Sequence, residues 1–216
     1  MKRTILIVIM FLTVELFVVQ MAQAQGTLYA SNLSATPMDS APVASDAWIA
    51  QAFLTGSNAD GYSLNSIQLL MDVASGSPNG FSVSIYSYSG KVGYVLGSKL
   101  GSLSGPGPTA GGIFAYIAPS LTLSPFTVYF IVLTSATPVA EGYYSSSIAN
   151  TYDYSSEDGW SITGSASSTD GSIWIPDRIH LLQCAVYATP IPEPATDALL
   201  GLGLAALSLW RWRQTR

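Results

Sequence analysis

The sequence predicts an all-β fold, an antiparallel β-sandwich of jelly-roll type with an N-terminal signal peptide and a C-terminal transmembrane helix. Three observations predict the sandwich. Between Gly26 and Ala188, apolar and hydroxyl residues alternate in short runs, as in half-buried strands. Gly, Pro, Asn and Ser separate these runs at short intervals, with no helical period. Charged residues make up only 10% of the chain, whereas ordinary soluble domains carry about 25%.

The strands can be placed from these patterns. The clearest covers residues 81–86, because it puts Phe81, Val83 and Ile85 on one face. The run 126–133 is almost continuously apolar, which predicts a central strand buried on both faces. Further strands are expected at residues 47–54, 64–71, 112–117, 142–148 and 180–188. Residues 25–188 therefore form the predicted β domain, with turn signals between its strands as in a sandwich.

The first 24 residues have the three parts of a secretory signal peptide. Lys2 and Arg3 precede an apolar run over residues 5–19, and Ala22 and Ala24 supply the small residues of a cleavage site. This pattern predicts passage through the Sec translocon and cleavage by signal peptidase after Ala24. The alternative is an uncleaved membrane anchor.

The last segment, residues 189–216, predicts a membrane-spanning tail. Prolines at 190, 192 and 194 keep its start extended. Residues 195–212 are mostly apolar and would form a helix of roughly 27 Å, just enough for a hydrocarbon core of about 30 Å. A basic end over 211–216, with Arg211, Arg213 and Arg216, favours the cytoplasmic side. The alternative, an amphipathic helix packed on the domain, fits poorly because residues 198–210 are apolar on every face.

The combination of Pro192-Glu193-Pro194, an apolar helix and a terminal basic cluster resembles the PEP-CTERM sorting signal of Gram-negative bacteria. The resemblance implies recognition by an exosortase, a membrane-embedded transpeptidase-like protease that acts at the motif. It also implies association with exopolysaccharide. The expected precursor is anchored in the inner membrane and then reaches the cell surface or extracellular matrix.

The domain itself resembles the choice-of-anchor surface domains, close to their R type. The similarity spans most of residues 30–180 and lies in the order and spacing of five segments: 51–56, 61–67, 80–86, 100–105 and 121–132. It implies a β-sandwich at the cell surface without established catalytic residues.

Charge excludes one class of partner. Residues 25–189 contain three basic and ten acidic residues, a net charge of −7. Nucleic-acid binding depends on neutralising phosphates with Lys and Arg, so we expect no nucleic-acid partner.

The single cysteine, Cys184, cannot form an intramolecular disulfide. A catalytic thiol needs a neighbouring base, and the only histidine is His180. On one strand these residues would share a face about 13 Å apart, at roughly 3.3 Å per residue. We therefore expect Cys184 to be a buried, structural residue beside Leu182 and Val186.

Two weaker candidate sites remain. Among the Asp-containing turns, Glu157 and Asp158 are the better candidates for a calcium site. These turns lack the alternating acids of a calcium loop, so the alternative is that their acids simply form turns. Apart from calcium, no cofactor is expected. Tyr152, Tyr154 and Trp160 lie in one acidic, Ser-rich stretch and could stack on sugar rings. The alternative is that Trp160 and half of these tyrosines belong to the core.

These observations favour a non-enzymatic surface or matrix protein associated with exopolysaccharide. The first alternative is a carbohydrate-binding module with a defined glycan site. The second is an exported hydrolase, which would need a second carboxylate across a cleft that nothing in the sequence identifies.

Overall fold

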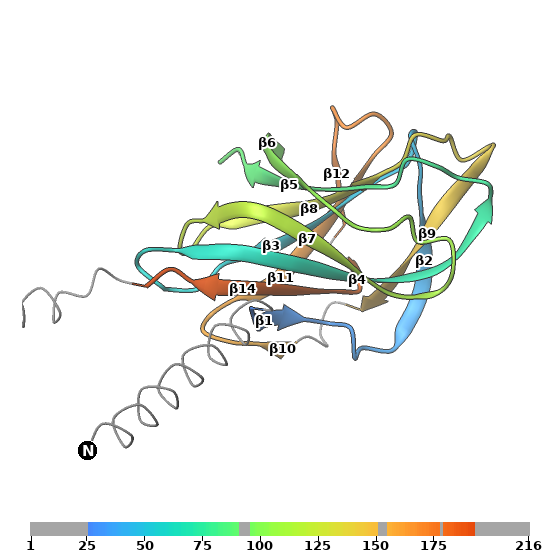
Figure 1. Cartoon of the computed structure of the whole chain (residues 1–216). Coiled ribbons are helices and arrows are strands. Elements are labelled where there is room, and N and C mark those ends of the chain that lie inside the picture. The colour runs from blue at the N-terminus through green and yellow to red at the C-terminus, as the bar shows by residue number, and fades with distance from the viewer. Residues whose placement is uncertain (1–25, 91–95, 151–154, 178, 193–216) are drawn as a thin grey trace, which may run out of the picture.

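The computed structural model describes residues 26–90, 96–150, 155–177 and 179–192. Within them the chain forms fourteen strands and no helix (Figure 1). All pairings between the strands are antiparallel, and they join the strands into two sheets. The prediction of an all-β, sandwich-like protein is confirmed at this level, and the jelly-roll order of the strands stays a prediction.

The larger sheet has eight strands: β1 (Thr27–Ser31), β2 (Pro37–Val43), β4 (Tyr62–Gly76), β7 (Gly112–Leu123), β9 (Gly142–Asn150), β10 (Ser155–Ser156), β13 (His180–Leu182) and β14 (Cys184–Pro190). Their order is β10-β1-β14-β4-β9-β13, with β2 paired to β9 and β7 paired to β4. The last strand, β14, therefore lies inside the sheet between β1 and β4.

The smaller sheet has six strands: β3 (Trp48–Leu54), β5 (Ser82–Tyr88), β6 (Leu96–Leu103), β8 (Val128–Thr134), β11 (Ser161–Ser168) and β12 (Ile175–Asp177). Their order is β12-β11-β3-β8-β5-β6. The chain passes from one sheet to the other at most of its connections, so most neighbouring strands in each sheet are not consecutive in the sequence.

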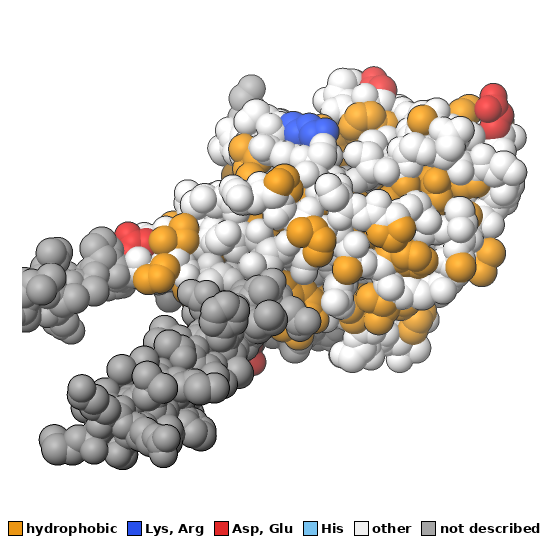
Figure 2. Space-filling view, viewed as in Figure 1, with side chains coloured by type: hydrophobic (Ala, Val, Ile, Leu, Met, Phe, Trp, Pro, Cys, Tyr) orange, Lys and Arg blue, Asp and Glu red, His pale blue; other side chains and the backbone are white. Residues whose placement is uncertain are grey.

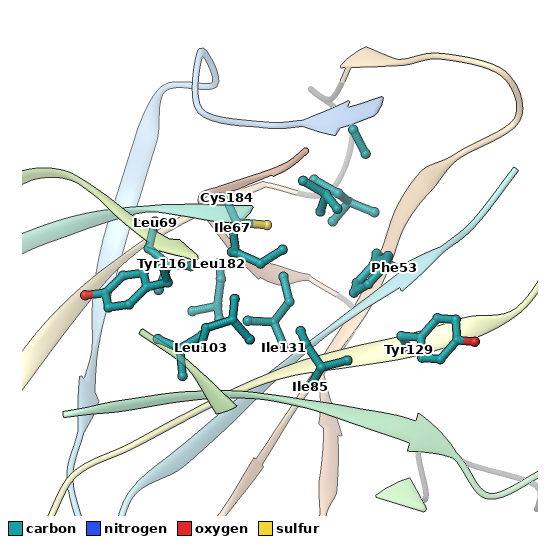
Figure 3. Packing of buried hydrophobic residues seen from close by; sticks show 14 of the residues in the cluster. Phe53, Ile67, Leu69, Ile85, Leu103, Tyr116, Tyr129, Ile131, Leu182 and Cys184 are labelled. Atoms are coloured by element: carbon teal, nitrogen blue, oxygen red, sulfur yellow. The ribbon is translucent and has the colours of Figure 1, made fainter. Parts of the chain in front are cut away.

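The main core lies between the two sheets (Figure 3). Val83 and Ile85 of β5 are fully buried and Phe81 packs against the same cluster, which confirms the predicted inward face. Strand β8 is buried on both sides, as predicted: Ile131 points into the main core, while Phe130 packs on the outer face in a second cluster with alanines of β3 and β11.

Most predicted strands have different ends in the structure: β4 and β7, for example, are longer than the predicted 64–71 and 112–117. Two differences have a clear physical reason. The strand predicted over residues 126–133 begins at Val128, because Phe126 lies in the preceding turn with a φ of 47° and a side chain that is 69% exposed. The strand predicted over 180–188 is two strands, since β13 pairs with β9 whereas β14 pairs with β4 and β1.

Buried amides explain the break at Gln183. Leu182 N–H donates to Gln51 Oε1 (2.9 Å), and Leu182 O accepts from Asn32 Nδ2 (2.9 Å). Cys184 N–H donates to Asn32 Oδ1 (2.7 Å), and Gln183 Nε2 donates to the Ala35 carbonyl (2.7 Å). These side chains replace ladder hydrogen bonds where the chain changes partner strands, so the buried backbone groups stay satisfied.

Candidate functional site

The last strand of the domain leads directly into the proline-rich tail. Strand β14 stays paired with β4 up to Pro190, which lies opposite Tyr62. The next residue, Ile191, donates its N–H to the Gly61 carbonyl (3.0 Å) and accepts from Asn58 Nδ2 at its own carbonyl (3.0 Å). Pro192 follows at once and is exposed. The first residue of the predicted sorting motif therefore comes directly after the last hydrogen-bonded residue of the domain.

The β3–β4 loop that holds Ile191 is itself tightly fixed. Asn58 N–H donates to the Tyr62 hydroxyl (3.0 Å), and Asn58 Nδ2 also contacts the Gly61 carbonyl. Gly61 has a φ of +81°, and a Cβ at this position would lie 2.3 Å from the Leu123 carbonyl oxygen. Only glycine fits this close approach at a positive φ, so the loop positions the tail through a residue that cannot be varied freely.

The N-terminus of the domain lies beside the same strand. Thr27 pairs with Ala188 in an antiparallel ladder, so β1 begins close to where β14 ends. The two strands lie side by side in Figure 1. Both segments predicted to enter the membrane, residues 1–24 and 195–212, therefore join the domain at one end of the sandwich.

Most residues predicted to act in sorting lie outside the described residues: Ala22, Ala24, Glu193, Pro194, Arg211, Arg213 and Arg216. The predicted transmembrane helix over residues 195–212 lies outside them as well. In the part of the chain that the structure describes, no helix is long and apolar enough to cross a membrane.

Trp160 is a core residue, which corrects its interpretation as a glycan contact. Its side chain is 1% exposed, and its ring stacks on Tyr29 (4.8 Å between centroids) and Phe53 (6.0 Å). Tyr62 meets it edge-on at 4.8 Å. The ring is therefore closed off from a sugar by other aromatic rings, as the alternative interpretation expected. Tyr152 and Tyr154 lie outside the described residues.

Glu157 and Asp158 form an exposed turn rather than a cluster of ligands. Glu157 N–H donates to the Tyr29 carbonyl (2.8 Å), and Trp160 N–H donates to the Glu157 carbonyl (2.9 Å). Asp158 adopts a φ of 50°, as Asp in turns can. Among the described residues, no three His, Cys, Asp or Glu side chains come together in a way that could hold a metal ion. Calcium binding stays a prediction.

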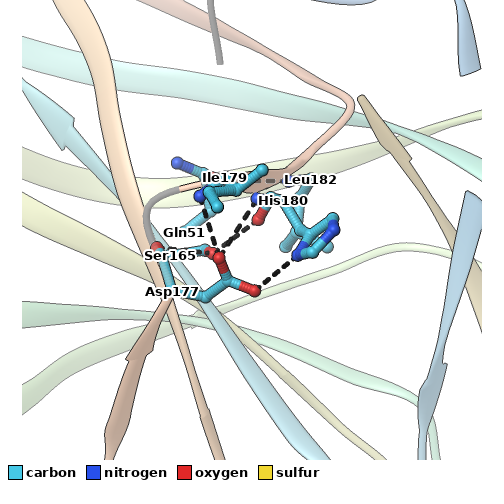
Figure 4. Close-up of polar contacts among 6 residues, drawn as sticks. All are labelled: Gln51, Ser165, Asp177, Ile179, His180 and Leu182. Carbon is cyan, nitrogen blue, oxygen red and sulfur yellow. Dashed lines mark hydrogen bonds and ion pairs between the residues drawn. The ribbon is translucent and has the colours of Figure 1, made fainter. Parts of the chain in front are cut away.

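A cleft of about 630 Å³ between β2, β3 and β11–β13 contains chemistry that the sequence did not single out. His180 Nδ1 lies 2.7 Å from Asp177 Oδ2, and Asp177 Oδ1 accepts from the N–H groups of Ile179 (2.8 Å) and His180 (3.2 Å) (Figure 4). Partial burial raises the pKa of Asp177, but these hydrogen bonds outweigh it and leave the pKa below its usual value. The sequence did offer a signal for this pair, because Asp177 and His180 are only three positions apart.

Ser165 lies in the same cleft but does not complete a nucleophilic triad. Its hydroxyl faces the carbonyl oxygens of Asp177 (3.1 Å) and His180 (2.5 Å), not the imidazole ring. An activated serine needs its hydroxyl bonded to the base that removes its proton. The three side chains therefore fix the connection from β12 to β13, and their polar contacts serve the fold.

Cys184 is buried, as predicted, and it does not share a site with His180. The thiol lies in the main core, and burial raises its pKa to about 12. His180 lies at the cleft with a side chain that is 42% exposed. The break at Gln183 gives the two residues different partner strands, so no thiol–imidazole pair forms.

A second hollow lies on the outer face of the larger sheet, over β4, β7 and β14. Its volume is about 610 Å³, and its lining combines the Tyr187 side chain with the amides of Asn65 and Gln68 and several serine hydroxyls. No charged residue lines it. Among the described residues, the side chains of Gln68 and Tyr187 have no hydrogen-bond partner, so both are available to a ligand.

Comparison with known families identifies the tail. A family model described as the PEP-CTERM protein-sorting motif matches residues 190–214. Neither the curated proteins nor the solved structures yielded a match to this chain. The match begins at Pro190, the last residue of β14. Residues 190–214 therefore carry a PEP-CTERM sorting signal, which implies an exported exosortase substrate with a cell-surface fate in Gram-negative bacteria.

Proposed function

We propose that the chain is a non-enzymatic surface or matrix protein whose domain is of the choice-of-anchor R type. Its precursor is held in the inner membrane by residues 195–212 until an exosortase acts at Pro192-Glu193-Pro194. The observation that carries the proposal is the junction at Ile191. The last described strand ends at Pro190, two residues before the motif, so cleavage at the motif would release the domain without cutting a described strand.

The surface of the domain supports a role in a polysaccharide matrix. The face seen in Figure 2 carries hydrophobic and uncharged polar side chains, with only a few acidic side chains and one basic group. Lys99 is the one Lys or Arg among the described residues. The hydroxyls and amides on such a surface can exchange hydrogen bonds with a hydrated, uncharged polymer, whereas the surface offers little attraction to acidic partners such as nucleic acids.

The test is processing of the full chain in a host with an exosortase and in the same host without it. In the first host we expect a surface protein whose intact mass lacks Arg216, and in the second a membrane-bound precursor. Glu193→Ala should give the precursor in both hosts. Glu141→Ala, an exposed acid of the domain, is the matched control and should be processed normally. A mature surface protein that still carried Arg216 in the first host would refute the sorting role.

A second candidate function, a carbohydrate-binding module, is favoured by the hollow on the outer sheet face. A tyrosine ring can stack on the apolar face of a sugar, and the unpaired Gln68 amide can bond its hydroxyls. The absence of charge in the lining favours a neutral glycan. In titrations with neutral oligosaccharides, Tyr187→Ala and Gln68→Ala should each abolish binding. Thr122→Ala, exposed on β7 and outside the lining, should not.

A further inference from the structure

We propose that the end of the domain next to the tail rests on the lipid headgroup layer while the tail is attached, and that Phe126 enters this layer. The inference rests on the proposed membrane helix over residues 195–212. It adds a second membrane contact, made by the folded domain itself, with a zwitterionic phospholipid surface as the partner.

Phe126 is presented to solvent by a fixed turn between β7 and β8. Its side chain is 69% exposed, and its φ of 47° is unusual for a bulky residue. The Phe126 N–H donates to the Gly56 carbonyl (2.9 Å), and Thr55 Oγ1 donates to the Ser124 carbonyl (2.7 Å). The phenyl ring is therefore held in water by a backbone conformation in which Gly or Asn would be less strained. Such a position indicates a role outside the core.

This turn and the start of the tail lie on either side of Gly61. The Gly61 carbonyl accepts from Ile191 N–H, and the Gly61 Cα lies against the Leu123 carbonyl, three residues before Phe126. The turn that carries Phe126 is therefore at the end of the sandwich from which the tail leaves.

The length of the connection places this end close to the membrane. Three residues, 192–194, separate Ile191 from the predicted start of the helix at Ala195, so the two residues are at most about 14 Å apart when the connection is extended. The headgroup region on each side of a bilayer is about 5–8 Å thick. The loops around Ile191 therefore lie within about 14 Å of the hydrocarbon core, in or slightly above the headgroups, whenever residues 195–212 span it.

The charges at this end favour an apolar contact over an electrostatic one. Asp60 lies in the β3–β4 loop, and the Asp158 backbone approaches Gly56 beside the Phe126 turn. Lys99, the single Lys or Arg among the described residues, is on β6 opposite Tyr86, which pairs with Phe130 of β8, so the acids at this end outnumber one cation on the nearer half of the smaller sheet. Anionic lipids would repel these acids, whereas an aromatic ring is favourable at the interface of a neutral bilayer.

The test measures the surroundings of residue 126 in the precursor from which the signal peptide has been removed, residues 25–216, reconstituted in phosphatidylcholine vesicles. Phe126→Cys is labelled with an environment-sensitive fluorophore. Ile173→Cys is the matched control, because Ile173 is 76% exposed and follows the end of β11 that pairs with Trp48, at the opposite end of β3 from Gly56. The unsubstituted chain, in which Cys184 is buried, is the labelling blank. Circular dichroism of both variants confirms that they fold.

We expect blue-shifted emission and quenching by spin-labelled lipids at position 126, with water-like emission at position 173. Cleavage of the tail should return position 126 to water-like emission. Water-like emission at 126 in a chain that floats with the vesicles would overturn the inference and leave the membrane helix intact. A chain that does not float at all would overturn the proposed membrane helix, and this inference with it.

Discussion

Replacing Trp160 by alanine separates the two interpretations of this residue. The ring is 1% exposed and contacts three other aromatic rings, those of Tyr29, Phe53 and Tyr62. Truncating a buried Trp to Ala costs about 3–5 kcal/mol, and each lost aromatic pair adds about 0.5–1.5 kcal/mol beyond its buried area. We expect a loss at the upper end of the first range. Small domains have roughly 5–15 kcal/mol of stability in total, so the variant should be close to unfolding.

Trp160→Phe provides a sharper comparison. It keeps an aromatic ring in the stack and removes Nε1, a buried donor that has no hydrogen-bond partner in the described structure. The smaller ring leaves a cavity, but the unpaired donor is no longer buried. We therefore expect this variant to lose only about 1–2 kcal/mol. Trp174→Ala, on the partly exposed cluster of the outer face, should lose less than Trp160→Ala.

Urea unfolding of the exported protein, followed by circular dichroism, measures all three variants at one temperature. The core interpretation requires Trp160→Ala to be the most destabilised of the three. A loss below about 1 kcal/mol, within the range of ordinary surface substitutions, together with a loss of glycan binding, would refute it and restore Trp160 as a ligand contact.

Further predictions concern the tail junction and two ionisable groups. Gly61→Ala should lose more stability than Gly159→Ala in urea unfolding. Their φ values are nearly equal at +81° and +80°, but only the former meets the Leu123 carbonyl; equal losses would contradict that contact. Cys184→Ala should lose about 1 kcal/mol or somewhat more, and the native thiol should resist labelling. Because burial raises its pKa from 9.0 to about 12, its stabilising effect should decline above pH 9.0; rapid labelling would contradict this. The pKa of Asp177 is lower in the folded protein than its ordinary value of 3.8, so its carboxylate stabilises the fold fully above pH 3.8. This stabilisation is lost as the pH falls through the pKa of the folded state. Asp177→Asn should flatten the acid limb of the stability curve measured by thermal melting.

Strands with apolar alternation were predictable from the sequence, and strands built from small polar residues were not. Strand β5 was evident because Val83 and Ile85 alternate with serines. Strand β11 reads SITGSASS and was missed, although Ser165 and Ser168 are buried in it. Serine has no strong strand preference, so β11 is a strand because β3 and β12 flank it. Such a tertiary cause cannot be read from a local pattern.

The same contrast separates the sorting tail, which was predictable from the sequence, from the contacts of the domain, which were not. The sorting signal was predictable because its order of proline motif, apolar helix and basic end is written along the chain. The buried ring of Trp160 and the bond from Ile191 to Gly61 depend on which strands meet, whereas Asp177 and His180 pair locally, three residues apart. For the first two contacts, the sequence shows the residues but does not show which residues lie next to them in the fold.

The position of β14 inside its sheet determines how the protein bears mechanical load. While the proposed membrane tail is still attached, any force between the domain and the membrane acts on the chain at Pro192. The force then acts on a strand that is hydrogen-bonded on both sides, to β1 and to β4. Peeling an edge strand breaks one ladder, but extracting β14 requires two ladders to fail together, along with the Ile191 bonds to Asn58 and Gly61. The tail is thus attached to a strand that is hydrogen-bonded to a neighbouring strand on each side.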